Sequence, residues 1–182
     1  MKEIAFVIGI CAVACFAISY LQREKRAIVL FAFISRVLYV AQYILLGAYA
    51  GAVLDVLSAI TIFLVQKKDG GLVQRYQKAF FIATNLAIIG AGITLSLTVD
   101  GWVGLLSMMG VLLQTDALWL KRERDIRIVS MSGCPFWLAY NLLVMAYGSV
   151  IGDVLSFVSL MSSLIRYDVL KMPVKHKPEY KE

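Results

Sequence analysis

The sequence predicts an all-α membrane protein with seven transmembrane helices, arranged as two parallel three-helix repeats joined by a linker helix. Three observations lead to this fold class. Of the 182 residues, 60% are hydrophobic and only 16% are charged, which leaves too little polar surface for a soluble globular domain. The apolar residues gather into seven runs. The chain also aligns with itself at an offset of 98 residues.

Each of the seven runs can cross a bilayer as a helix, because a span needs roughly 20 mostly apolar residues. The first run differs from a signal peptide, since Glu3 offsets Lys2, no convincing small-residue cleavage site follows, and six more apolar runs come after it. The third run is short, which local thinning of the bilayer accommodates. In chain order the runs are 4–21, 27–48, 51–66, 79–98, 102–120, 126–147 and 150–167.

The connections between the runs alternate in charge. Basic residues gather between the first and second runs, the third and fourth, the fifth and sixth, and again after the seventh. The other connections are Gly47–Gly51, Asp100-Gly101 and Gly148-Ser149. With seven spans, 16 of the 18 Lys and Arg residues lie on one side, which the positive-inside rule assigns to the cytoplasm. We therefore expect the N-terminus outside and the C-terminus in the cytoplasm.

The second half of the chain repeats the first. Val37–Thr61 aligns with Pro135–Ser159 with eight identities in 25 positions, including an Asp-Val-Leu-Ser stretch that begins at Asp55 and at Asp153. A single helix between the copies gives them the same orientation. The predicted units are a first three-helix repeat at residues 1–66, a cytoplasmic loop and linker helix at 67–98, a second three-helix repeat at 99–167 and a basic cytoplasmic tail at 168–182.

This 3+1+3 order with an outer N-terminus resembles the SWEET and PQ-loop (MtN3-like) transporter superfamily, and the chain is similar to the YgjV-type bacterial inner-membrane proteins. The resemblance rests on Leu45–Tyr49, on Gly110 with Thr115–Trp119, and on Trp137 with Tyr140-Asn141 and Gly148. It implies a multi-pass transporter of the bacterial inner membrane with a SWEET-like fold. The chain departs from the superfamily in lacking a Pro-Gln pair and in having Asp55 and Thr61 where Asn and Arg are common.

Four ionisable side chains lie inside the predicted spans, at Arg36, Asp55, Asp116 and Asp153. A charge near the bilayer centre costs roughly 2.5–3.5 kcal/mol on insertion scales, so each is a candidate site residue. Arg36 lies near mid-bilayer, where we expect an Asp as its partner. Asp55 and Asp153 occupy equivalent points of the repeat. They either line a solute pathway or cap the outer turns of their helices, and the two roles are compatible.

Further polar and aromatic groups complete the candidate site. Asp116 with Gln114 is a candidate gate or rim, the alternative for Asp116 being an ion pair with Lys121 or Arg122. Aromatic and amide groups follow the helix-bending Pro135, and an interfacial aromatic belt is the competing interpretation for them. The predicted substrate-binding residues are Arg36, Gln42, Tyr43, Asp55, Trp137, Tyr140, Asn141 and Asp153.

Catalysis and metal binding find no support in the sequence. The single histidine, His176, lies in the tail, and Cys11, Cys15 and Cys134 have no CxxC spacing. No Ser or Cys has a base within plausible reach, and no phosphate-binding Gly loop follows a strand. We therefore expect no enzyme, no catalytic residues, no cofactor and no metal.

The sequence thus favours an integral membrane transporter of a small polar solute, working by alternating access between the two repeats. The alternative is a structural or sensory membrane protein whose cytoplasmic tail recruits a partner. The expected partners are the solute and membrane lipid, with a homo-oligomer left open. No nucleic acid is expected, because topology and anionic lipid account for the net charge of +6.

Overall fold

The computed structural model describes residues 2–21, 25–67 and 70–170, and within them the chain is helical with no strand. Seven long helices coincide with the seven predicted apolar runs, so the predicted all-α class is confirmed. A short helix, α4 (Gly71–Arg75), lies in the third connection, and the π-helical segments η1 (Ser96–Asp100) and η2 (Leu164–Val169) extend α5 and α8. The long helices are α1 (Lys2–Leu21), α2 (Lys25–Leu46), α3 (Tyr49–Val65), α5 (Gln77–Leu95), α6 (Val103–Ala117), α7 (Glu123–Leu143) and α8 (Tyr147–Ser163).

Length and composition alone identify two helices in the described residues that can cross a membrane, Gln77–Asp100 and Tyr147–Arg166. Shorter apolar helical stretches in the described residues are Phe33–Leu46, Tyr49–Val65 and Val103–Ala117. At 1.5 Å per residue, α3 and α6, with 17 and 15 residues, fall short of a hydrocarbon core about 30 Å thick. Length and composition in the described residues thus support two of the seven predicted spans.

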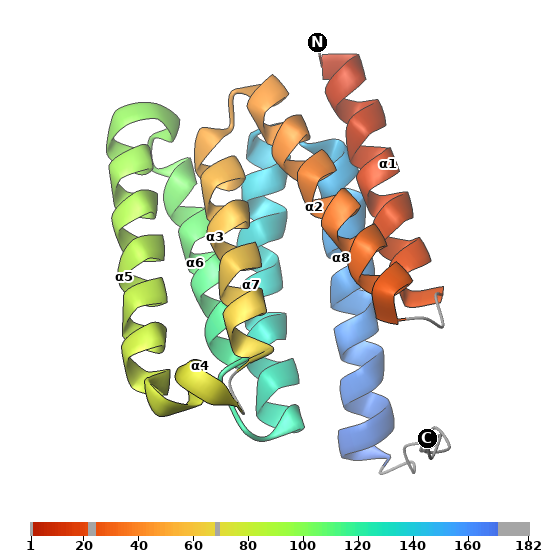
Figure 1. The fold of residues 1–182 in the computed structure, drawn as a ribbon. Coiled ribbons are helices and arrows are strands. Elements are labelled where there is room, and N and C mark those ends of the chain that lie inside the picture. The colour runs from red at the N-terminus through yellow and green to blue at the C-terminus, as the bar shows by residue number, and fades with distance from the viewer. Residues whose placement is uncertain (1, 22–24, 68–69, 171–182) are drawn as a thin grey trace.

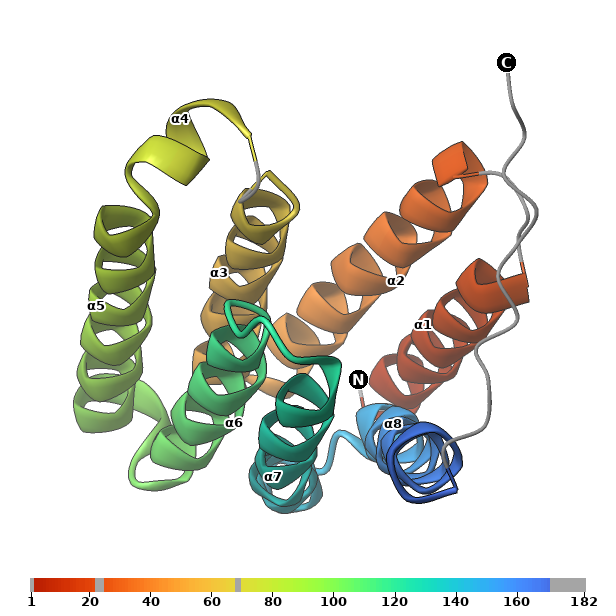
Figure 2. The ribbon, with the colours of Figure 1, turned by 90° about the horizontal axis from the view of Figure 1, so that it is seen from below.

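Six of the long helices form a ring. Helix α1 packs against α2 and α8, α3 packs against α2 and α6, and α7 packs against α6 and α8. Figure 2 shows this ring end-on, with α5 outside it against α3 and α6. Exchanging α1, α2 and α3 with α6, α7 and α8 reproduces the same pairs of neighbours. The ring therefore has the contact pattern of a pseudo-twofold arrangement.

The connections gather by kind at the two ends of the bundle (Figure 1). The α2–α3, η1–α6 and α7–α8 turns lie at the end where α1 begins, whereas the connections that include α4 and the α6–α7 link lie at the opposite end. Lys67, Arg75, Lys121 and Arg122 belong to the second group. The charge alternation read along the chain is thus a separation in space.

The turn between α2 and α3 recurs 98 residues later between α7 and α8. Gly47 and Met145 both have a positive φ, of 72° and 59°. The next amide in each turn reaches back to the carbonyl five residues earlier, from Ala48 to Tyr43 at 2.9 Å and from Ala146 to Asn141 at 2.8 Å. Both helices therefore end in a Schellman motif. Met145 adopts the left-handed conformation at some cost where its counterpart is glycine.

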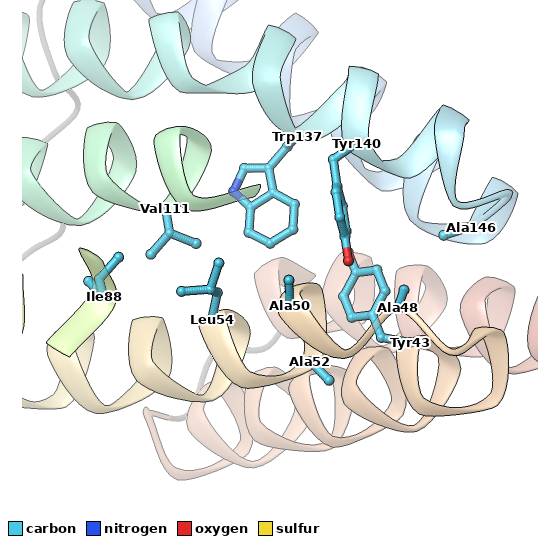
Figure 3. Packing of buried hydrophobic residues seen from close by; sticks show 10 residues of the cluster. All are labelled: Tyr43, Ala48, Ala50, Ala52, Leu54, Ile88, Val111, Trp137, Tyr140 and Ala146. Carbon is cyan, nitrogen blue, oxygen red and sulfur yellow. The ribbon is translucent and has the colours of Figure 1, made fainter. Parts of the chain in front are cut away.

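The bundle is apolar outside and partly polar inside. Large apolar side chains are exposed on every long helix, with Phe33 66% and Leu97 82% exposed, whereas Ser35, Ser107 and Thr115 are buried. An exposed apolar surface of this extent suits lipid better than water. The central apolar cluster joins α2, α3, α5, α6 and α7, as Figure 3 shows, and includes Leu54, Ile88 and Val111.

Candidate functional site

A cavity of about 100 Å³ opens inside the ring, and every one of the six ring helices contributes to its wall. Polar, charged and aromatic side chains make up most of this wall. The lining residues are Phe16, Arg36, Tyr39, Tyr43, Asp55, Gln114, Trp137, Ser149, Gly152, Asp153 and Ser156. A liquid water occupies about 30 Å³, so the space suits a few waters or one small solute.

Three pairs of equivalent positions of the sequence repeat line this cavity. Phe16 and Gln114, Tyr39 and Trp137, and Asp55 and Asp153 are each separated by 98 residues, and all six line the wall. The cavity therefore lies where the pseudo-twofold axis of the ring passes. Asp55 and Asp153 thus line one cavity from the two halves.

Arg36 and Asp55 form an ion pair across α2 and α3. The Asp55 side chain is only 5% exposed, whereas Arg36 keeps 37% of its side-chain surface accessible. The second carboxylate oxygen of Asp55 is buried without a hydrogen-bond partner. The expectation that a carboxylate meets Arg36 is fulfilled by Asp55, and Arg36 keeps the larger exposed fraction of its side chain.

A second polar chain runs from Tyr43 through Asn141 to Asp153. The Tyr43 hydroxyl donates to Asn141 Oδ1 at 2.9 Å, and Asn141 Nδ2 donates to Asp153 Oδ2 at 2.7 Å. Tyr43 and Asn141 are themselves repeat equivalents, so their hydrogen bond joins the two halves close to the axis. Asn141 orients Asp153 from behind, while Tyr43 and Asp153 line the cavity.

Aromatic rings form one side of the site. Trp137 stacks on Tyr43 with ring centroids 6.3 Å apart and planes at 21°, and Tyr140 meets Trp137 edge-on at 5.9 Å. Figure 3 shows Trp137 and Tyr140 pointing from α7 toward α3 and Tyr43. Gly110 makes room for this arrangement, since a Cβ there would lie 2.8 Å from Trp137 Cδ1. Trp137 is 6% exposed, so the rings are fixed by packing.

Gln42 and Tyr140 lie beside the cavity wall, in contacts between helices. Ser149 Oγ donates to Gln42 Oε1 at 2.8 Å, and the Gly51 amide donates to the Tyr140 hydroxyl at 2.8 Å. These two contacts are repeat equivalents of each other. Among the predicted substrate-binding residues, Gln42, Tyr140 and Asn141 are the ones that do not line the cavity. Each makes a side-chain hydrogen bond to another helix, and Gln42 Nε2 is buried without a hydrogen-bond partner.

For α3, the helix-capping role left open for Asp55 falls to Asp100. Asp100 Oδ2 accepts from the Ala50 amide in the first turn of α3 at 2.7 Å and from the Tyr140 hydroxyl at 3.3 Å. Asp55 and Asp153 sit deeper in their helices, and their side chains bond to Arg36 and Asn141. Sequence reasoning missed Asp100, although an acid in an otherwise uncharged outer turn was a signal for an N-terminal cap.

The two candidate gate residues, Gln114 and Asp116, lie in different environments. Gln114 lines the cavity, whereas Asp116 points to the α5 interface and accepts a hydrogen bond from Asn85 Nδ2 at 2.9 Å. The contact that the structure gives Asp116 is thus an amide on the neighbouring helix, in place of the Lys121 or Arg122 partner considered from sequence. The half-buried carboxylate is satisfied here by an amide donor.

The arrangement of charges and rings can hold a small polar molecule in a desolvated space between two similar halves. The model of the Imp-YgjV family, described as bacterial inner membrane protein, matches residues 3–171. No curated protein and no solved structure matches the chain. Because the match runs over nearly all of the sequence, the chain belongs to the Imp-YgjV family of bacterial inner membrane proteins.

Proposed function

We propose that this protein carries a small polar solute across the bacterial inner membrane by alternating access between its two halves. The observation that carries the proposal is the cavity on the pseudo-twofold axis, lined by equivalent residues of both halves. Transporters built from repeats place their substrate site at the repeat interface, where a rocking motion exposes it to either side. A purely structural membrane protein would not need a cavity lined by charged side chains at its centre.

In this proposal all seven long helices cross the membrane in a 3+1+3 order, with α5 as the linker, and the fold belongs with the SWEET and PQ-loop superfamily. The recurring helix contacts and Schellman turns support two parallel units. The shorter helices reach across by local thinning of the bilayer. The gathering of basic connections at one end supports a cytoplasmic C-terminus and an outer N-terminus (Figure 1).

The solute contacts fall on the lining residues in this proposal. Arg36, Asp55 and Asp153 supply charge, Tyr43 and Trp137 supply aromatic faces, and Gln114 lines the wall from α6. Buried charges are costly unless paired or met by a ligand, so their presence around a cavity favours a transported solute over a purely structural role. Gln42, Tyr140 and Asn141 then act by fixing the wall.

Ligand-dependent stabilisation followed by flux tests the proposal. A metabolite library is screened by thermal unfolding of the purified protein in detergent, where a solute at 100 times its Kd adds about 2.7 kcal/mol. We expect a polar solute that raises Tm in the wild type, fails to do so when Ser156→Phe fills the cavity, and enters proteoliposomes containing the wild type. Binding unaffected by Ser156→Phe would move the site elsewhere. A bound solute that is never transported would favour a sensory protein.

A further inference from the structure

The charges that line the cavity do not cancel. Arg36 and Asp55 neutralise each other as an ion pair. Asp153 has an amide partner, Asn141, at 2.7 Å, and makes no ion pair with any Lys or Arg in the part of the chain that the structure describes. With both carboxylates ionised, the lining therefore has a net charge of −1.

The walls around Asp153 are aromatic. Tyr39, Tyr43 and Trp137 line the same cavity as the carboxylate. The Tyr39 hydroxyl lies against Gly152, the residue before Asp153, since a Cβ there would come within 2.6 Å of Tyr39 Oη. Aromatic faces attract cations through the ring quadrupole, most strongly where water is excluded. One unpaired carboxylate among several rings is a recognition pattern for an organic cation.

Other solute classes fit these charges less well. An anion would have to compete with Asp55 for Arg36 while lying in a cavity that also contains Asp153. A neutral solute would leave the Asp153 carboxylate with only its amide donor in a buried space, where an uncompensated charge is costly. A cation would form an ion pair with Asp153 and would also contact the aromatic rings that line the cavity.

We propose that the cavity binds a small organic cation, a primary amine or a methylated ammonium group, with Asp153 as its counter-ion and Tyr39, Tyr43 and Trp137 as its aromatic walls. This deepens the proposed function, on which it rests, by naming the substrate class of the same cavity. The cavity volume of about 100 Å³ restricts the cation to a few heavy atoms or to one small head group.

Thermal unfolding of the full chain in detergent tests the proposal with methylammonium and tetramethylammonium chloride as probes. Sodium chloride at the same concentration controls for ionic strength, and sodium acetate and glycerol represent the anionic and neutral classes. We expect both ammonium salts to raise Tm above the sodium chloride value and to do so saturably, with acetate and glycerol giving no such rise. A rise with acetate alone, or with none of the four, would overturn the assignment.

Three variants place the cation in the cavity. Asp153→Asn removes the counter-ion at constant shape and should weaken the apparent Kd for tetramethylammonium at least about tenfold. Asp168→Asn is the matched control, because Asp168 pairs with Arg127 and does not line the cavity. It should leave the Kd unchanged. Tyr39→Leu should weaken binding severalfold whereas Tyr39→Phe, which keeps the ring, should not.

Equal binding by wild type and both Asp153→Asn and Tyr39→Leu would contradict the proposal, and the tyrosine variants decide the matter if Asp153→Asn does not fold. Flux in proteoliposomes separates this inference from the transport proposal. Cation binding that depends on Asp153 without any flux would retain the binding site and refute transport. Flux of a neutral solute by a protein that binds neither ammonium salt would retain transport and refute the cation site.

Discussion

At the scale of single residues, the Arg36–Asp55 ion pair is the contact in the interior whose disruption should destabilise the fold most. Asp55 is almost fully buried and one of its oxygens has no other partner, so removing the guanidinium leaves an isolated buried carboxylate. We expect Arg36→Ala to lower the free energy of unfolding by about 3–5 kcal/mol. Asp55→Asn should cost less, because Arg36 lines the cavity and the asparagine oxygen can still accept a hydrogen bond from it.

The double variant distinguishes an ion pair from two independent contacts. Once Arg36 is gone, neutralising Asp55 relieves the uncompensated charge, so Arg36→Ala with Asp55→Asn should unfold at a higher temperature than Arg36→Ala alone. Thermal unfolding in detergent of the four proteins gives the coupling energy. Strictly additive losses would show that the two side chains do not depend on each other.

Tyr140 illustrates a residue whose role differs between sequence and structure. Its hydroxyl accepts from the buried Gly51 amide and donates to Asp100, so Tyr140→Phe leaves that amide without an acceptor. We expect a loss of about 1–3 kcal/mol in unfolding free energy. Solute affinity should stay at the wild-type value because the ring, which packs edge-on against Trp137, is retained. A fall in affinity without a fall in Tm would return Tyr140 to the solute site.

The roles of some residues could be predicted from the sequence, and the roles of others could not. The depth of Arg36 in an apolar run required a carboxylate partner, and the repeat narrowed that partner to Asp55 or Asp153. The choice between them depends on how α2 and α3 face each other, which no local pattern encodes. Asp100 and Ala50 are 50 residues apart, so the cap between them arises only when η1 and α3 are brought to the same end of the bundle.

At the scale of helices, close contacts depend on glycine at one crossing in particular. A Cβ on Gly148 would lie 2.5 Å from Gly9 Cα, where the obstacle is backbone and no side chain can move aside. Gly148→Ala should therefore separate α1 from α8 and cost about 1–3 kcal/mol. Gly90→Ala is the matched control, since a Cβ there meets nothing within 4 Å, and it should stabilise α5 by about 0.5–1 kcal/mol.

Thermal unfolding of the two glycine variants checks the crossing. Equal Tm values for Gly148→Ala and Gly90→Ala would mean that α1 and α8 are not held at this distance.

The helix boundaries show which helices the hydropathy of the sequence can predict. The apolar runs located each long helix to within a few residues, whereas α4 escaped prediction because Gly71–Arg75 is short and carries no apolar periodicity.

At the scale of the whole molecule, the internal repeat predicted that the two halves are equivalent. It did not predict how the two halves pack against each other. Identities such as Asp55 with Asp153 indicated two copies of one unit. They did not show that α1 packs against α8 and α3 against α6, closing one ring around a shared cavity. The ring closes because the two halves pack against each other. The sequence similarity of the two halves does not determine that packing.

The orientation in the membrane is tested by labelling two positions of equal exposure at opposite ends of the bundle. Trp102 follows η1 in the group of turns without Lys or Arg, and Leu72 lies in α4 in the basic group, each 66% exposed. In intact cells an impermeant thiol reagent should modify Trp102→Cys and leave Leu72→Cys unmodified until the cells are opened. The parent chain supplies the background from its native cysteines, and the reverse pattern would invert the topology.

The cation site that we propose predicts competition with protons, because the two carboxylates have different partners. Asp55 is held by Arg36, whereas Asp153 faces the cavity with only an amide donor, so a proton and an organic cation compete for Asp153. Protonation removes its charge, and the apparent Kd for tetramethylammonium should therefore weaken as the pH falls, by up to about tenfold per pH unit. The quaternary ion has no proton to lose, which assigns any pH effect to the protein.

The other groups that line the cavity with Asp153 and titrate or carry charge are Tyr39, Tyr43 and the Arg36–Asp55 pair. Asp55→Asn should consequently keep the pH dependence of tetramethylammonium binding, while Asp153→Asn should abolish it along with most of the affinity. Titration of Tm shifts from acidic to neutral pH in the three proteins measures this difference. A pH dependence that disappears in Asp55→Asn would make Asp55 the exchanging group and Asp153 the structural one. Affinity that is constant with pH in the wild type would exclude competition between proton and cation and leave facilitated diffusion as the mode of transport.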